Sequence, residues 1–127
     1  WGGGGVSGYL FVGDVVNHCI RQIDIATASV TTLAGFPLGA HIDGPALGAR
    51  FYHPSHMAIS KDGNLLFIAD GSNRRYRLIN RALPITDDRY VTTIAGTGAA
   101  GTADGQIRSS HMPRRYSCNA RGVKLGQ

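Results

Sequence analysis

Apolar residues along this chain fall into short runs, many of them β-branched or aromatic, and the runs are separated by stretches rich in Gly, Asp and Asn. Runs of this length and composition are typical of β-strands and are too short for stable helices. The pattern predicts strands at residues 9–13, 19–24, 29–34, 57–60, 65–69, 75–80 and 90–95. Most connections between them are short, so neighbouring strands are expected to pair antiparallel.

Three local features refine this prediction. Lys61-Asp62-Gly63-Asn64 lies between two apolar runs and is the strongest hairpin signal in the chain. Ile20 and Ile23 lie an odd number of positions apart, so a bulge or extra twist is needed for both to face a core. Residues 46–51, within the long connection at 35–56, could form one helical turn.

The chain also repeats itself. Residues 9–14 (YLFVGD) match residues 65–70 (LLFIAD) at a spacing of 56, and an Asn and an Arg follow at the same positions in both copies. Residues 30–35 (VTTLAG) match 91–96 (VTTIAG) at a spacing of 61, as Asp43-Gly44 matches Asp104-Gly105. One such unit cannot bury its own apolar faces, so the repeat predicts stacked or radial β-sheets. The second unit has four strands, whereas the first lacks its first strand.

Composition and charge divide the chain. The 127 residues are one domain's worth, and 18 Gly with no Glu suit a turn-rich chain. We expect a Gly-rich lead-in at 1–8, the repeats at 9–105 and a tail without repeat character at 106–127. The net charge of +5 arises wholly in that tail, which carries five basic residues and no acid. A basic tail can contact nucleic acid or acidic membranes, but only its charge supports that interpretation, and a solvated tail is the more common case.

The sequence gives limited information about the redox state, targeting and compartment of the chain. Two cysteines, Cys19 and Cys118, make no disulfide framework, and we expect them to be reduced. No apolar run is long enough to span a membrane, and the first residues lack the pattern of a signal peptide. The compartment is therefore unknown from the sequence. The absence of an initiator Met leads us to expect that the chain is a fragment of a longer one.

The segment from Asp14 to Asp24 resembles the core motif of NHL repeats. Further matches to the long-loop form of that repeat follow in order: residues 30–35, Asp43-Gly44, 49–51, Pro54 and 61–64. The resemblance covers about residues 9–105. It implies an all-β fold of antiparallel four-stranded propeller blades, with an incomplete propeller of about two blades in this chain. In the family, the rims and loops commonly bind proteins and sometimes RNA, and one relative is an amidating lyase that uses a metal in the central channel.

Two blades do not close a propeller ring, which takes four to eight. An open pair leaves apolar sheet faces uncovered. We therefore expect the ring to be completed by further blades or by self-association of copies.

Candidate chemistry is sparse. The repeated residues are interpreted as structural, because Asp and Asn satisfy turn donors and Arg pairs with Asp; they are Asp14, Asn17, Arg21, Asp70, Asn73 and Arg77. His53 and His56 could join His41 or Asp43 around a metal, but the spacing matches no known signature. No nucleophile elbow is present, and the Gly-rich stretch at 96–101 opens no helix, as a dinucleotide site would require. We expect no catalytic residue, no metal and no cofactor.

The densest basic segment of the repeats runs from Arg74 to Arg77, with Tyr76 inside it. Strand alternation would place Arg75 and Arg77 on one face and Tyr76 on the other. Two Arg on a rim could contact the phosphates of RNA. The candidate binding residues are therefore Arg74, Arg75, Tyr76, Arg77, His53 and His56.

The function predicted from these observations is a non-catalytic scaffold that binds a macromolecular partner, most simply a protein, through the connections at 35–56 and 81–89. Two alternatives stay open. One is a part of a metal-assisted, lyase-like propeller enzyme, and the other is an RNA-binding propeller.

Overall fold

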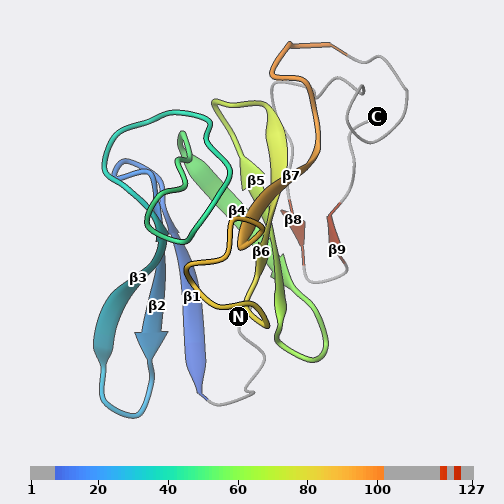
Figure 1. Ribbon diagram of the computed structural model, residues 1–127. Coiled ribbons are helices and arrows are strands. Elements are labelled where there is room, and N and C mark those ends of the chain that lie inside the picture. The colour runs from blue at the N-terminus through green and yellow to red at the C-terminus, as the bar shows by residue number, and fades with distance from the viewer. Residues whose placement is uncertain (1–7, 102–117, 120–121, 124–127) are drawn as a thin grey trace.

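The computed structural model describes residues 8–101 and the backbone of residues 118–119 and 122–123. Two antiparallel sheets dominate it (Figure 1). The first blade contains β1 (Tyr9–Asp14), β2 (Cys19–Asp24) and β3 (Ser29–Gly35) in that order. The second blade contains β4 (Pro54–Ile59), β5 (Leu65–Asp70), β6 (Arg75–Asn80) and β7 (Val91–Ala95). A separate short pair follows, of β8 (Cys118–Asn119) and β9 (Gly122–Val123).

This architecture confirms the all-β, antiparallel prediction of one four-stranded blade and one that lacks its first strand. The described part of the chain contains no helix, and hence none that could span a membrane. Of the expected divisions, residues 1–7 lie outside the described residues, and so does the tail at 106–127 apart from β8 and β9.

The long connection differs from the expectation in two details. The strand β4 begins at Pro54 rather than Met57, so the connection between the blades, called here the inter-blade loop, spans residues 36–53. The single helical turn expected within residues 46–51 is present one position earlier: the amide of Ala49 donates to the carbonyl oxygen of Pro45, four residues before it, over 2.9 Å. It does not continue as a helix.

The turns follow from short polar side chains. In the hairpin between β4 and β5, the Asp62 carboxylate accepts from the Ser60 hydroxyl at 2.6 Å and from the Asn64 amide at 3.0 Å. Gly63 takes a φ of 79°, which glycine adopts without steric cost. In the turns after β1 and β5, the left-handed residues are His18 and Arg74, with φ of 57° and 51°. In both turns the left-handed residue directly follows the repeated Asn, which is Asn17 in the first and Asn73 in the second.

The predicted bulge is present, and it recurs in the second blade. The pairing of β2 with β3 shifts register between Ile20 and Arg21, and that of β6 with β7 shifts between Tyr76 and Arg77. These are equivalent positions of the repeat. The shift leaves Ile20 fully buried, while Ile23 is only partly buried.

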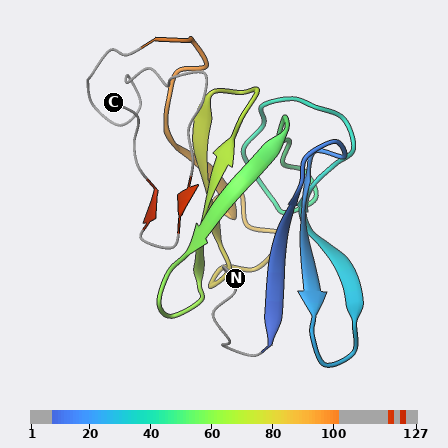
Figure 2. The ribbon, with the colours of Figure 1, turned by 180° about the vertical axis from the view of Figure 1, so that it is seen from behind.

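The main core lies between the two blades (Figure 2). It is built from one face of each sheet and from the inter-blade loop, with the residues Phe11, Ile20, Ala34, Ala46, Ala49, Phe51, Leu66, Ile68, Ile79, Tyr90 and Val91. The sheets approach closely at Gly13, where an added Cβ would lie 2.8 Å from the carbonyl oxygens of Pro54 and Ser55. The two repeats therefore fold as sheets that pack on one another.

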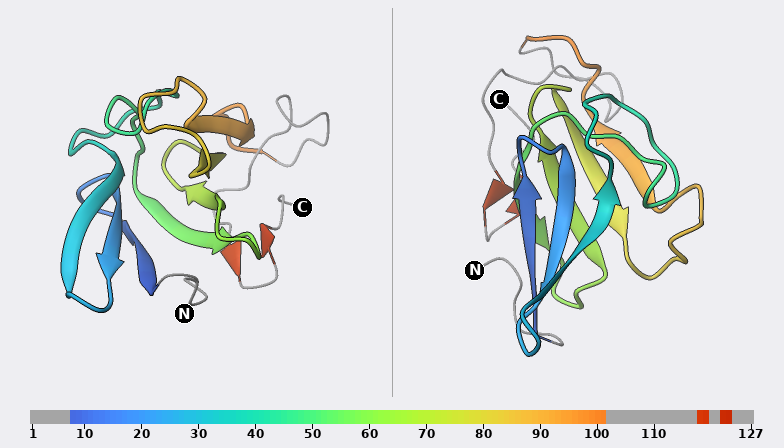
Figure 3. Two further views of the ribbon diagram at one scale, coloured as in Figure 1. Left: turned by 60° about the horizontal axis from the view of Figure 1, so that its bottom comes forward. Right: turned by 90° about the vertical axis from the view of Figure 1, so that its left-hand side faces the viewer.

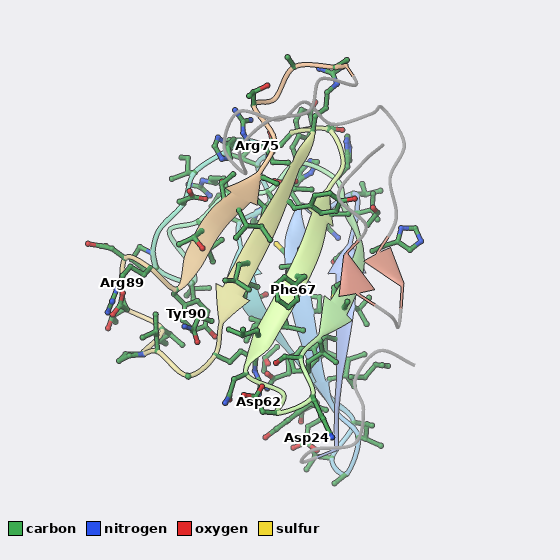
Figure 4. The ribbon with its side chains drawn as sticks, turned by 90° about the vertical axis from the view of Figure 1, so that its right-hand side faces the viewer. Asp24, Asp62, Phe67, Arg75, Arg89 and Tyr90 are labelled. Atoms are coloured by element: carbon green, nitrogen blue, oxygen red, sulfur yellow. The ribbon has the colours of Figure 1, made fainter. Side chains whose placement is uncertain are left out.

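The second blade has another apolar face. Ala58, Ala69, Tyr76 and Ala95 form a smaller buried cluster there. Phe67 lies on the same side of the sheet, pointing away from the first blade (Figure 4).

Candidate binding surface

A buried ion pair lies in the second blade, where β5 ends and β6 begins. Arg77 Nη1 lies 2.7 Å from Asp70 Oδ2, and both side chains are completely buried. Asn73 Nδ2 also donates to Asp70 Oδ2 at 2.7 Å. Burial raises the pKa of Asp70, while Arg77 and the hydrogen bonds from Asn73 and the Tyr52 amide oppose that rise. Such a pair persists in a core only when its remaining polar atoms have partners.

The inter-blade loop supplies those partners. Arg77 donates to the carbonyl oxygens of Arg50 at 2.8 Å and Ile42 at 2.9 Å. Asn73 Nδ2 donates to the carbonyl oxygen of Ala40 at 2.7 Å, and the amide of Tyr52 donates to Asp70 Oδ1 at 2.7 Å. The loop is thus fastened to the second blade along much of its length.

Asp43 completes the attachment. Its carboxylate lies 2.7 Å from Arg77 Nη2 and accepts from the Thr93 hydroxyl at 2.9 Å and the Thr93 amide at 3.1 Å. His41 Nε2 lies 2.8 Å from the same hydroxyl oxygen. Burial, then Arg77 and Arg75, lower the pKa of His41. These groups border a hollow of about 400 Å³, whose other lining residues are Arg75, Thr92, Gly96 and Thr97.

The first blade repeats this cluster as Asp14, Asn17 and Arg21, and there its side chains are partly exposed to solvent. Arg21 Nε lies 3.1 Å from Asp14 Oδ2, and the two side chains are 31% and 28% exposed. Asn17 Nδ2 donates to both Asp14 oxygens, and Arg21 Nη1 donates to the hydroxyl of Thr32. The hydrogen bond from Asn17, together with Arg21, lowers the pKa of Asp14. Within residues 8–101, no loop corresponding to 36–53 lies against this cluster.

The six candidate binding residues are spread over different environments. Tyr76 and Arg77 are fully buried, so a partner cannot reach their side chains in this chain. Arg74 donates to the carbonyl oxygen of Gly98 at 3.2 Å, and Arg75 donates to that of Thr97 at 2.7 Å. Both therefore hold the segment after β7. RNA contact by this stretch stays a prediction, open to Arg74 and Arg75 alone.

The two histidines do not come together with His41. His53 stacks on Tyr52 with ring centroids 4.6 Å apart, and its backbone amide donates to His18 Nδ1 at 3.1 Å. His56 lies exposed on β4. Across the described residues, no three His, Cys or Asp side chains converge as a metal site requires.

The two connections that were expected to contact partners do lie side by side (Figure 3, left). The amide of Ala46 donates to the carbonyl oxygen of Ile85 at 2.9 Å, and Gly44 and Val91 exchange two backbone bonds of 3.0 Å. Large apolar side chains stay exposed on these connections. We call Leu38, Ile42, Leu47 and Ile85 the loop face; they are 65%, 48%, 61% and 60% exposed.

Sequence reasoning did not find the role of Asp43. It was considered only as a possible metal ligand, whereas it joins the inter-blade loop to Arg77 and Thr93 of the second blade. A signal was available, because Asp43-Gly44 recurs as Asp104-Gly105 at the spacing of the outer strands. An acid repeated with its strand can serve the packing between neighbouring repeats.

Curated proteins similar to the chain include NHL repeat-containing protein 2 of Bos taurus, which is 31% identical over 104 residues and 76% of the chain. The human protein of that name is 31% identical over 56% of the chain. Protein SUPPRESSOR OF QUENCHING 1, chloroplastic, of Arabidopsis thaliana is 30% identical over 93% of the chain. The matched regions cover only 10 to 14% of these relatives' own lengths. No protein-family model matches the chain.

Solved structures share the fold. A Bacteroides thetaiotaomicron protein of unknown function superposes with a TM-score of 0.76 at 22% identity, over 91% of this chain and 28% of its own. An auxiliary nutrient binding protein of Bacteroides ovatus superposes with a TM-score of 0.65 at 20% identity, over 87% of this chain and 28% of its own. At these identities the likeness shows the fold alone.

Proposed function

Because the chain belongs to the NHL-repeat β-propeller family, we propose that it is a non-catalytic interaction module, which binds a protein partner through its loop face. The loop face carries the proposal. It joins the two longest connections of the repeats and exposes four large apolar side chains on a backbone that is held firmly in place. Exposed apolar groups on rigidly supported loops are typical of protein-binding surfaces.

The hollow beside His41 offers less support for catalysis. Both oxygens of Asp43 already accept hydrogen bonds, and Arg75 is occupied by carbonyl oxygens. A general acid or base needs a free proton position directed at a substrate. These side chains instead satisfy one another.

The test is comparative cross-linking in a native extract, with the bound proteins identified by mass spectrometry. The variant Ile42→Ser with Ile85→Ser removes two apolar side chains of the loop face and leaves the backbone bonds of both loops. Val16→Ser is the matched control, because Val16 is 79% exposed in the turn between β1 and β2. We expect proteins captured by the unmodified chain to be lost with the double variant and retained with the control. Equal capture by all three chains would refute a role for the loop face.

A further inference from the structure

The hollow beside His41 has the size and lining of a site for a small polar molecule. Its volume is about 400 Å³, and small-molecule sites occupy about 300–1,000 Å³. The inter-blade loop, β6, β7 and the segment after β7 all contribute to its wall. None of the described residues that line it carries a large apolar side chain, so the hollow suits a hydrophilic ligand.

The repeat provides a comparison for this hollow. The first blade has an equivalent hollow of about 480 Å³, in which Cys19 replaces Arg75 and Phe36 replaces Thr97. Leu47 makes the wall of that hollow still more apolar. A blade of this type therefore folds without a cation or a hydroxyl at these two positions. The requirements of the fold do not explain why the second blade has Arg75 and Thr97 there.

Arg75 lies at the end of the second blade opposite Asp62 and is held in place without a counter-ion (Figure 4). Its Nη2 donates to the carbonyl oxygen of Thr97 at 2.7 Å, and its Nη1 donates to that of Asn73 at 3.3 Å. Its guanidinium packs on Gly98, where an added Cβ would lie 2.8 Å from both Nη atoms. No carboxylate within residues 8–101 forms an ion pair with it. The two carbonyl oxygens use two of its five N–H groups and leave three for a ligand.

His41 offers an acceptor to the same hollow. The Asp43 carboxylate accepts the proton of the Thr93 hydroxyl over 2.9 Å. His41 Nε2 lies 2.8 Å from that hydroxyl oxygen and must therefore be the donor of the bond between them. Burial, then Arg77 and Arg75, lower the pKa of His41, so the ring is neutral near pH 7 and its Nδ1 keeps a lone pair. Among the hydrogen bonds of residues 8–101, none uses this Nδ1.

The charges around the hollow favour one anionic group. Asp43 also borders the hollow, but its carboxylate is paired with Arg77 Nη2 at 2.7 Å. At the His41 ring, the influence of Arg77 and that of Arg75 each exceed the influence of Asp43. Arg75 is the single permanent cation among the described residues of the wall, so the hollow matches one anion rather than a run of phosphates.

We propose that this hollow binds a hydroxylated carboxylate of about the size of a sugar acid. The ligand's carboxylate would accept from the remaining N–H groups of Arg75, because a guanidinium matches a carboxylate with two parallel hydrogen bonds. A hydroxyl of the ligand would donate to His41 Nδ1, and another would meet the Thr97 hydroxyl. The proposal does not depend on the proposed function, because the hollow and the loop face are different surfaces.

Isothermal titration of the full chain with D-glucuronate and D-galacturonate tests the class of ligand. We expect one of them to bind about tenfold or more tightly than D-glucose, which lacks the carboxylate, and than acetate, which lacks the hydroxyls. Inorganic phosphate is titrated in parallel and should bind more weakly than the sugar acid. In ¹H–¹⁵N spectra, the sugar acid should shift the amides of Thr93, Gly96 and Thr97 and leave those of Phe36 and Leu47, in the first-blade hollow, unchanged.

Substitutions test the two groups that contact the ligand. Arg75→Gln should weaken binding of the sugar acid about tenfold or more. Arg74→Gln is the matched control, because Arg74 donates to the carbonyl oxygen of Gly98 and does not line the hollow. It removes the same charge and should change the affinity by about twofold or less, since salt screens a charge that makes no contact. His41→Phe keeps a ring without an acceptor and should reduce the preference for the sugar acid over acetate.

Three results would overturn the proposal. The first is that neither sugar acid shifts the amides around the hollow. The second is an equal loss of affinity in Arg74→Gln and Arg75→Gln, which would reduce the binding to general positive charge. The third is tighter binding of inorganic phosphate than of either sugar acid. If Arg75→Gln does not fold, the amide shifts and the phosphate titration of the unmodified chain still decide.

Discussion

The two copies of the Asp-Asn-Arg cluster allow one substitution to be compared in two environments. Asp70→Ala removes a fully buried carboxylate from Arg77, whereas Asp14→Ala removes its partly exposed counterpart from Arg21. Sequence and local turn are matched, so the difference isolates burial and the contribution of the inter-blade loop. Each residue is the last of its strand, Asp14 of β1 and Asp70 of β5.

The expected magnitudes follow from the contacts. Loss of Asp70 leaves Arg77 buried with only Asp43 as its counter-ion, and it removes the acceptor of the Tyr52 amide. Breaking a buried pair by removing one partner costs about 3–5 kcal/mol of unfolding free energy. Loss of Asp14 breaks a solvent-screened pair, which is worth at most about 1 kcal/mol. Out of a total stability of about 5–15 kcal/mol, the first loss is large and the second is small.

Urea unfolding monitored by tyrosine fluorescence and circular dichroism gives the comparison. At a slope of about 2 kcal/mol/M, Asp70→Ala should shift the midpoint by about 2 M and Asp14→Ala by about 0.5 M or less. Equal shifts for the two variants would refute the reasoning, because they would show that the loop adds nothing to the second cluster. A small shift for both would mean that Arg77 does not depend on Asp70.

Three further predictions concern close packing, reactivity and pH. Gly13→Ala should destabilise the chain by about 1–3 kcal/mol in urea unfolding, because the new Cβ meets two carbonyl oxygens of β4. The control Gly48→Ala should be near neutral, because its Cβ would have no contact nearer than 3.7 Å. Similar urea midpoints for the two variants would contradict the close approach of the sheets at Gly13. Cys19 is 1% exposed, and burial raises the pKa of its thiol. Peptide mapping should therefore find Cys19 unmodified by iodoacetamide in the folded chain and modified in urea. Labelling at the same rate in both conditions would count against this burial. Because the folded-state pKa of His41 lies below its ordinary value of 6.5, the stability it contributes is present above that value and is lost as the pH falls. The urea midpoint should therefore drop between about pH 7.5 and 5.5, and the drop should be smaller in His41→Gln; an unchanged drop would remove His41 as its cause.

Much of the fold could be predicted from local pattern. The strands are bounded by Gly, Asp and Asn turns that act within a few residues, so their positions agree closely with the structure. The odd separation of Ile20 and Ile23 predicted a bulge, which is present at Ile20 and recurs at Tyr76. Pro54 was placed in the connection, whereas it is the first residue of β4, a position at which proline is tolerated because it need not donate to the ladder.

The candidate site was harder to predict, because it depends on contacts between distant residues. Nothing local distinguishes Arg77 from Arg21, although one is fully buried and the other is 31% exposed. The difference arises from the inter-blade loop, which lies 24 to 41 residues earlier in the chain than Arg77. Its groups hydrogen-bond to the second cluster and not to the first. The basic stretch at 74–77 was interpreted as a possible binding strip, but two of its side chains are buried within the blade.

Most of the bonds that fasten the inter-blade loop to the second blade use main-chain atoms, at Ala40, Ile42, Arg50 and Tyr52. Every amino acid carries a carbonyl oxygen, and every one except proline carries the amide hydrogen that Tyr52 donates, so these attachments survive when the side chains at the same positions change. The outward side chains of the loop can therefore change and bind different partners, while the contact between the blades keeps its geometry. Packing of the two repeats thus depends on main-chain atoms, and changes in partner recognition depend on side-chain atoms of the same residues.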